Sequence, residues 1–224
     1  MIRAVIFDMD GLLVDSEPYW ERARAEYCRA LGCDWRPQDE LTVKGANSPE
    51  WAARILERCG FSLPPAEIIA GVSQRMLDLY RQHLPLLPGA IEAVRLLAAH
   101  FPLAIASSSP PELIEHAMAE AGIRGCFQVV VSADRTGRGK PSPDVFLAAA
   151  QQLNVPSVAI AVFEDSSAGI MAGRAAGMYV IAVPNGHYPP SETALAQADV
   201  VLRTLGEVRL DLLTDPPSRP VPAH

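Results

Sequence analysis

From residue 86 onward, the sequence alternates short apolar segments with segments of helical periodicity. Short apolar runs rich in β-branched residues are typical of buried strands, and apolar residues three and four positions apart indicate helices. Strands that alternate with helices predict a parallel sheet with helices on both faces. We therefore expect an α/β fold with a Rossmann-like parallel sheet. The expected strands are 3–7, 103–106, 128–132, 158–163, 179–183 and a short edge strand at 199–202, and the expected helices are 90–99, 111–121, 143–153 and 167–176.

A run of helical patterns separates the first strand from the rest of this alternation. The patterns cover 17–31, 49–59 and 65–83, with apolar residues at helical spacing in the last of them. We expect residues 1–14 and 86–214 to form an α/β core, and residues 15–85 to form an inserted helical cap. Residues 215–224 are rich in proline, which predicts a disordered tail.

Composition excludes several classes of function. The chain has 224 residues, a net charge of −7 and no long basic stripe, which disfavours binding to nucleic acid. No apolar run approaches the ~18 residues of a membrane span, and no secretory leader is visible, so we expect a cytoplasmic protein. The four cysteines have no zinc-ligand spacing, and we expect them to be reduced and mostly buried.

The first expected strand ends in two aspartates, Asp8 and Asp10, which Gly11 follows. If the strand stays extended through Asp10, both side chains point the same way, because side chains alternate along a strand. A carboxylate can act as a covalent nucleophile, and a neighbouring carboxyl group can transfer protons. The alternative is an acidic turn in which Asp15 or Ser16 caps the following helix.

Polar residues also follow the second and third expected strands. Ser107 and Ser108 stand directly before a helix, where hydroxyl and N–H groups can bind an anion, although serines there also serve as N-caps. Lys140 lies between Gly139 and Pro141, and a lysine point charge is a natural phosphate ligand. For Lys140 the alternative is a solvated surface position.

The fourth expected strand ends in Glu164 and Asp165, which could simply be acidic residues at a helix start. Together with Asp8 and Asp10, they bring four carboxylates to one edge of the sheet. Four converging carboxylates repel one another unless a cation lies between them. A hard divalent cation with oxygen ligands beside a phosphate predicts Mg²⁺.

Taken together, these motifs resemble the haloacid dehalogenase superfamily, and within it the group of sugar-phosphate phosphatases and β-phosphoglucomutases. The resemblance covers nearly the whole chain except the proline-rich end, and the helical insertion after the first motif matches the family's cap. It rests on four motifs in order: Asp8-Met9-Asp10-Gly11, Ser107, Lys140-Pro141 and Glu164-Asp165.

The resemblance implies a role for each motif. Asp8 is the expected nucleophile, which forms a phosphoaspartate, and Asp10 is the expected acid and base. The expected phosphate ligands are Ser107, Ser108 and Lys140, and the expected Mg²⁺ ligands are Asp8, the backbone carbonyl of Asp10, Asp165, and Glu164 either directly or through water.

We expect this enzyme to be a phosphatase acting on a small phosphomonoester, namely a sugar or sugar-alcohol phosphate. Residues 15–20 resemble hexitol and 2-deoxyglucose 6-phosphate phosphatases. A β-phosphoglucomutase-type isomerase is the alternative, but the mutases have a histidine where this chain has Trp20, and an arginine near Ser48. A dehalogenase would lack Asp10, a phosphonate hydrolase needs a cap lysine such as Lys44, and a non-catalytic interaction module would have lost catalytic positions.

The expected cap also supplies candidates for substrate specificity, namely Trp20, Lys44 and Asn47. Trp20 could stack on a sugar face, with packing in the core as the alternative. Lys44 could pair with substrate charge, with a solvated position as the alternative. No role is assigned to the five histidines. The expected partner is a small phosphorylated metabolite rather than nucleic acid or a membrane, and the expected state is a monomer.

Overall fold

The computed structural model describes residues 1–43 and 45–214. The predictions for Lys44 and for the tail at 215–224 concern residues outside these ranges. The strands are β1 (Ala4–Phe7), β2 (Leu103–Ser107), β3 (Val129–Ser132), β4 (Ile160–Glu164), β5 (Tyr179–Ala182) and β6 (Val200–Val201). The α-helices are α1 (Glu17–Ala30), α2 (Pro37–Glu40), α3 (Ser48–Cys59), α4 (Pro65–Gln82), α5 (Ala90–Ala98), α6 (Pro111–Glu120), α7 (Asp144–Leu153), α8 (Ser167–Ala175), α9 (Glu192–Leu195) and α10 (Asp211–Thr214).

The strands of the described residues form one parallel sheet in the order β3-β2-β1-β4-β5-β6. The predicted α/β class is therefore confirmed. Strand β1 lies in the middle, between β2 and β4, so the residues that follow it reach the centre of the sheet edge. Ligands of such sheets bind beyond the carboxyl ends of the strands.

Helices cover both faces of the sheet because the strands have apolar side chains on both faces. Val5 and Phe7 of β1 belong to a core with α5 and α6, whereas Ala4 and Ile6 belong to a core with α7 and α8. The ring of Phe7 stacks on Phe163 of β4 at a centroid distance of 4.9 Å. Burying one such side chain contributes ~2 kcal/mol, so the sheet centre is held firmly in place.

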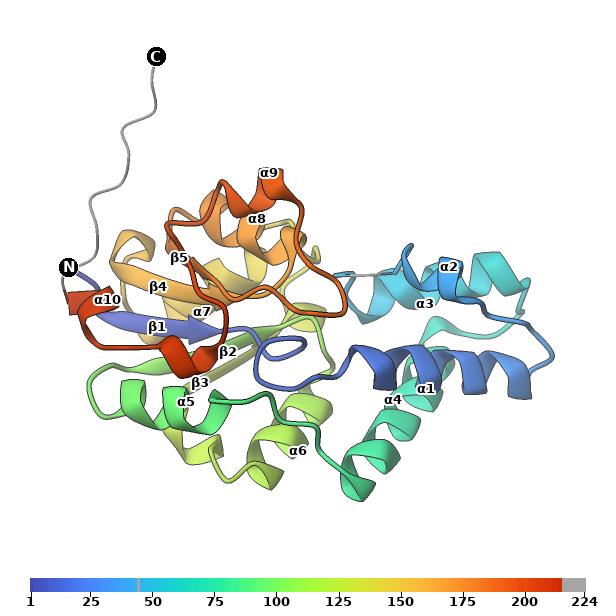
Figure 1. Cartoon of the computed structure of the whole chain (residues 1–224). Helices are drawn as coiled ribbons and strands as arrows, with labels where there is room; N and C mark the ends of the chain where they lie inside the picture. Colours follow the sequence, from blue (N-terminus) through green and yellow to red (C-terminus); the bar gives the residue numbers. More distant parts are fainter. Residues whose placement is uncertain (44, 215–224) are drawn as a thin grey trace, which may run out of the picture.

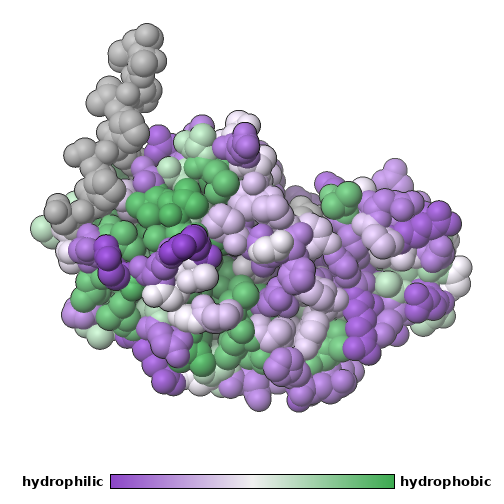
Figure 2. Space-filling view, viewed as in Figure 1, coloured by the Kyte–Doolittle hydropathy of each residue, from purple (hydrophilic) through white to green (hydrophobic). Residues whose placement is uncertain are grey.

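The helices α1 to α4, here called the helical segment, pack beside the sheet beyond the carboxyl end of β1 (Figure 1). Helix α4 contacts both α1 and α3. Apolar stripes such as Trp51, Ala52 and Ile55 of α3 are buried in these contacts. Figure 2 shows mostly hydrophilic residues over these helices on the face in view, as expected when apolar stripes point inward.

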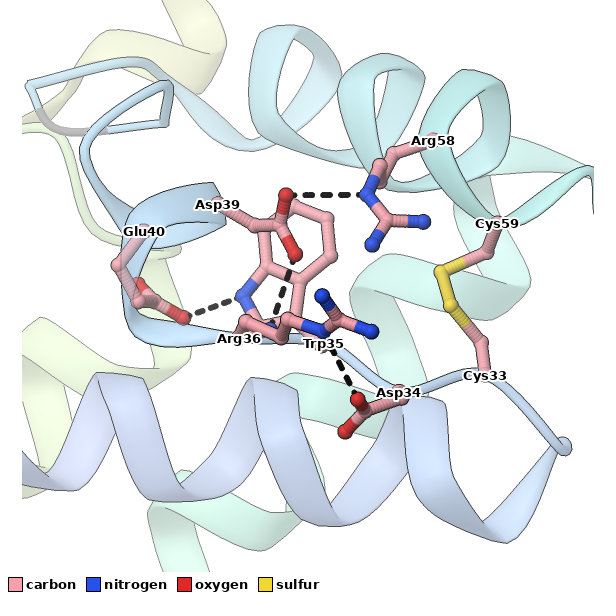
Figure 3. The surroundings of a disulfide bond; sticks show 8 residues. All are labelled: Cys33, Asp34, Trp35, Arg36, Asp39, Glu40, Arg58 and Cys59. Atoms are coloured by element: carbon pink, nitrogen blue, oxygen red, sulfur yellow. Dashed lines mark hydrogen bonds and ion pairs between the residues drawn. A yellow bond between two sulfur atoms is a disulfide. The ribbon is translucent and has the colours of Figure 1, made fainter.

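The structure corrects one prediction, that all four cysteines are reduced. Cys33 and Cys59 form a disulfide with a Cα–Cα distance of 5.6 Å, whereas Cys28 and Cys126 are free (Figure 3). Cys33 follows the end of α1, and Cys59 is the last residue of α3. Their 26-residue separation in sequence gave no indication of pairing, because packing of the helical segment is what brings the two helix ends together.

Candidate active site

Asp8 directly follows β1, which ends at Phe7, and Asp10 forms an isolated bridge with Val14 directly before the turn at 11–13. Gly11 makes this turn possible, with a backbone φ of +78° that other residues rarely adopt. A Cβ added to Gly11 would also lie 2.2 Å from Oδ2 of Asp165. The two aspartates therefore lie just beyond the paired part of β1, before the turn that leads toward α1.

Lys140 lies at the centre of the site and is buried, so the solvated alternative does not hold. Its Nζ is 2.8 Å from Oδ1 of Asp8 and 2.7 Å from Oε1 of Glu164. It also donates a hydrogen bond of 3.3 Å to the carbonyl of Ala106 in β2. These partners fix the direction of the ammonium group at the sheet edge.

Asp8, Glu164 and Asp165 form a buried group, here called the acidic cluster, in which one carboxylate oxygen of each lies within 4.8 Å of the others. Glu164 is saturated with donors, since its Oε2 accepts from the N–H groups of Asp165 and Ser166. By contrast, Oδ1 of Asp165 is buried and has no hydrogen-bond partner among the described residues.

Electrostatics in the acidic cluster favour an additional cation. Burial, opposed by Lys140 and reinforced by Glu164 and Asp10, raises the pKa of Asp8 to about 8. Burial and the neighbouring Glu164 hold the pKa of Asp165 well above its usual range. One ammonium group thus faces three carboxylates, and the remaining negative charge fits a hard cation with oxygen ligands.

Asp10 is held by donors from two separate segments, the start of α1 and the end of β2. Its Oδ1 accepts from Oγ of Ser16 at 2.7 Å and from Nε1 of Trp20 at 3.0 Å. Its Oδ2 accepts from Oγ of Ser107 at 2.9 Å and from Oγ of Ser109 at 2.8 Å. The Ser16 hydroxyl makes no cap hydrogen bond to α1, so its bond to Asp10 replaces the predicted capping role.

The consecutive serines that begin at the last residue of β2, Ser107 to Ser109, make different contacts. Ser107 is fully buried beneath Asp10, and its hydroxyl also accepts from the N–H of Ser109 at 2.9 Å. The hydroxyl of Ser108 donates to the carbonyl of Gly45 at 3.2 Å. Proline at 110 and 111 contributes no N–H to the start of α6, which leaves hydroxyl groups as the main donors of this run.

A pocket opens at this site, between the sheet edge and the helical segment. Of the predicted site residues, it brings together Asp8, Asp10, Trp20, Ser108, Lys140 and Asp165. Sequence reasoning missed other lining residues, above all Ser109 and three residues of the helical segment, Arg24, Glu40 and Trp51. The sequence showed that Arg24 lies within a helical pattern, but its burial is visible only in the structure.

The structure does not bring Asn47 to this pocket. Asn47 is the N-cap of α3, where its Oδ1 accepts from the N–H of Glu50 at 3.1 Å. Its Nδ2 donates to the carbonyl of Gly137 in the core at 2.9 Å. Asn47 therefore joins the helical segment to the core rather than lining the pocket.

Comparison with known proteins identifies the class. The family model of the haloacid dehalogenase-like hydrolases matches residues 2–177, and the chain belongs to this family. It is 35% identical over 210 residues to hexitol phosphatase B of Escherichia coli strain K12, which covers 92% of this chain and 94% of that protein.

Two further relatives extend the comparison. The chain is 34% identical over 217 residues to the bifunctional riboflavin kinase/FMN phosphatase of Arabidopsis thaliana, covering 95% of this chain but only 56% of that protein. The crystal structure of CbbY from Rhodobacter sphaeroides in complex with phosphate superposes with a TM-score of 0.83 at 30% identity, covering 92% and 96% of the two chains. The protein is a phosphoric monoester hydrolase, and its class generally uses a metal ion, for which the acidic cluster is present. None of the helices in 1–43 and 45–214 combines the length and apolar character that spanning a membrane requires.

Proposed function

We propose that this enzyme hydrolyses a sugar or sugar-alcohol phosphate through a phosphoaspartate on Asp8, with Mg²⁺ as the cation. The observation that carries the proposal is that Lys140 contacts Asp8 of the acidic cluster at the edge of a pocket that Asp10 also lines. Names of relatives support the substrate class, including hexitol phosphatase B and a fructose-1-phosphate phosphatase of Escherichia coli strain K12.

Asp8 attacks the phosphorus atom in this mechanism, and the leaving oxygen departs on the opposite side. An anionic nucleophile and an anionic substrate repel each other, so the phosphoryl charge must be neutralised. Lys140, fixed 2.8 Å from Asp8, supplies one positive charge at that point. Ser108 lines the pocket and offers a hydroxyl group for the phosphoryl oxygens, while Ser107 acts from beneath by holding Asp10.

Asp10 is the proton carrier in this proposal. It protonates the leaving oxygen and then takes a proton from the water that hydrolyses the phosphoaspartate. Its four hydrogen bonds from Ser16, Trp20, Ser107 and Ser109 hold the carboxyl group at the pocket wall. General acid catalysis depends on such positioning within hydrogen-bond reach of the substrate.

The chain's own residues fit Mg²⁺ at the acidic cluster. Asp8 and Asp165 would provide direct oxygen ligands, the latter through the unpartnered Oδ1, and the backbone carbonyl of Asp10 would provide another. Glu164, whose oxygens already accept from Lys140 and two N–H groups, orients the others or acts through water. When bound, Mg²⁺ supplies charge neutralisation for phosphoryl transfer.

We further propose that residues 15–85 act as a cap domain over the 1–14 and 86–214 core. The pocket is walled on one side by the sheet edge and on the other by Trp20, Arg24 and Trp51 of the helical segment. A cap in this place excludes water and selects substrates. The monomer remains our expected state.

Release of inorganic phosphate tests the proposal. We expect turnover with Mg²⁺ across a set of hexose and hexitol phosphates, at rates above those for nucleotides, and a loss of at least about a thousandfold in Asp8→Asn. Equal rates for Asp8→Asn and the wild type would contradict the nucleophile assignment. Conversion of β-glucose 1-phosphate to glucose 6-phosphate would favour the isomerase instead.

A further inference from the structure

The end of the pocket farther along α1 contains a buried ion pair that the proposed chemistry does not use. Arg24 of α1 and Glu40 of α2 are joined through Nη1 and Oε2, and both side chains are at most 9% exposed. The guanidinium of Arg24 lies over the ring of Trp20 at 4.9 Å and over that of Trp51 at 5.7 Å. All four residues line the pocket.

The ring of Trp20 lies between the Arg24–Glu40 pair and Asp10, the proposed proton carrier. Trp20 donates from Nε1 to Asp10, and its ring contacts Arg24. A substrate whose leaving oxygen is at Asp10 would therefore extend the rest of its leaving group past Trp20 toward Arg24 and Glu40. Nε of Arg24 is buried and has no hydrogen-bond partner among residues 1–43 and 45–214, so the guanidinium is not saturated by protein acceptors.

Glu40 is held in place by a dedicated scaffold (Figure 3). Its Oε1 accepts from Nε1 of Trp35 at 2.6 Å. The neighbouring Asp39 accepts from the N–H of Arg36 and from Nε of Arg58, which precedes the disulfide-bonded Cys59. A four-residue helix is not stable alone, so these contacts are what present Glu40 to the pocket.

The charge of this end selects the kind of group it can accept. The ion pair is neutral in sum, and Glu17 and Glu21 also line the pocket. A second phosphate or a carboxylate would meet excess negative charge in a buried place, which is costly. A hydroxyl group can donate to Glu40 and accept from Arg24, so a chain of hydroxyls fits where an anion does not.

We propose that Arg24 and Glu40 form the leaving-group subsite and select uncharged polyhydroxylated leaving groups over anionic ones. The inference rests on the proposed function and sharpens it. It assigns the specificity of the site to a neutral, buried ion pair, and it assigns to Glu40 the rejection of bisphosphates and phosphorylated carboxylic acids.

The test compares three substrates in wild type and Glu40→Gln. Sorbitol 6-phosphate has an uncharged six-carbon polyol, 6-phosphogluconate has a chain of the same length that ends in a carboxylate, and the leaving group of acetyl phosphate is too short to reach Arg24. Glu40→Gln keeps the side-chain size but leaves Arg24 without its counter-charge. We expect the ratio of kcat/KM for sorbitol 6-phosphate over 6-phosphogluconate to fall at least tenfold, with less than a threefold change for acetyl phosphate.

Glu26→Gln is the matched control, because it removes a carboxylate from the exposed Arg22–Glu26 pair on the same helix. It should leave all three substrates unchanged. As a measurement that needs no variant, free sorbitol should inhibit wild-type turnover of sorbitol 6-phosphate competitively, and gluconate at the same concentration should not.

An unchanged ratio in Glu40→Gln, equal losses on all three substrates, or equal inhibition by sorbitol and gluconate would each overturn the subsite. If wild type released no phosphate from acetyl phosphate or from any phosphomonoester, the proposed function itself would fall and the subsite with it.

Discussion

At the scale of single residues, Asp8 shows the conflict between stability and chemistry. Burial raises the pKa of its carboxyl group to about 8, with Glu164 and Asp10 adding to the shift and Lys140 opposing it. In the unfolded chain the pKa is near 3.8. The folded state therefore binds the Asp8 proton more tightly, and the free energy of unfolding falls as the pH rises from about 4 to about 8.

Asp8→Asn removes this cost. In the absence of divalent cations, we expect the variant to be more stable than wild type at pH 8, by on the order of 2 kcal/mol, and to show a smaller advantage at pH 5. Urea unfolding with a chelator at the two pH values measures this. A variant that is less stable than wild type at pH 8 would show that Asp8 is a net stabilising partner of Lys140.

Gly11 is a second residue that the site constrains, because its backbone has a positive φ and lies close to Asp165. Gly11→Ala adds left-handed strain and places a Cβ 2.2 Å from Oδ2 of Asp165. Gly177→Ala is the matched control, since Gly177 has a φ of +75° but no neighbour within 4 Å of its added Cβ. We expect Gly177→Ala to cost about 1 kcal/mol of unfolding free energy and Gly11→Ala at least about twice that.

A displaced Asp165 should also weaken Mg²⁺ binding in Gly11→Ala. We expect a higher Mg²⁺ concentration for half-maximal phosphate release, at least about tenfold above that of wild type. Gly177→Ala should keep the wild-type value. Identical Mg²⁺ dependence in all three proteins would argue against Asp165 as a ligand.

At the scale of elements, the disulfide joins the ends of α1 and α3 and closes a loop across the helical segment. A cross-link of this separation constrains the unfolded chain, and its loss costs roughly 3 kcal/mol. We expect Cys33→Ser or a reducing agent to lower the free energy of unfolding by about that amount. Cys126→Ser, at a free cysteine, is the control for urea unfolding, and an equal effect of both substitutions would contradict this account.

At the scale of the whole molecule, three hydrogen bonds dock the start of α3 on the core. The N–H of Ser48 donates to Oδ1 of Asp134 at 2.7 Å, Asn47 donates to Gly137, and the N–H of Gly139 donates to Oε1 of Glu50 at 3.2 Å. These bonds hold the helical segment against the edge of the sheet. They therefore set the shape of the pocket.

Asp134→Ala removes the acceptor of the shortest of these bonds. We expect kcat/KM to fall about tenfold on every substrate, including acetyl phosphate, because the loss of a hydrogen bond to a carboxylate costs ~1.5–3 kcal/mol of the docked arrangement. This uniform effect differs from the substrate-dependent effect of Glu40→Gln. Asp211→Ala, in an exposed pair with Arg209, is the control, and rates equal to its own would mean that docking at Asp134 is dispensable.

Much of the fold was predictable from local patterns. Strands such as β1 and β4 are apolar on both faces, so burial leaves them few alternatives, and their predicted ranges differ from the observed ones by one or two residues. The four-residue helices α2, α9 and α10 were missed because so short a segment has no periodicity to read. Their stability comes from contacts with distant residues, as in the bond from Arg58 to Asp39.

By itself, the sequence determined the parallel sheet, the order of its strands along the chain, and the delivery of Asp8, Lys140 and Asp165 to one edge. These features follow from hydrophobic periodicity and from polar residues at strand ends, which are local properties. Only the tertiary structure decided that Cys33 pairs with Cys59, that Ser16 bonds to Asp10 instead of capping α1, and that Asn47 faces the core. It likewise placed Arg24 and Glu40 in the pocket. The disulfide and the Arg24–Glu40 pair depend on how the helices α1 to α4 pack on one another, and the contact of Asn47 with Gly137 depends on how these helices pack against the core. The bond from Ser16 to Asp10 depends on the turn between the two residues, which hydrophobic periodicity does not predict.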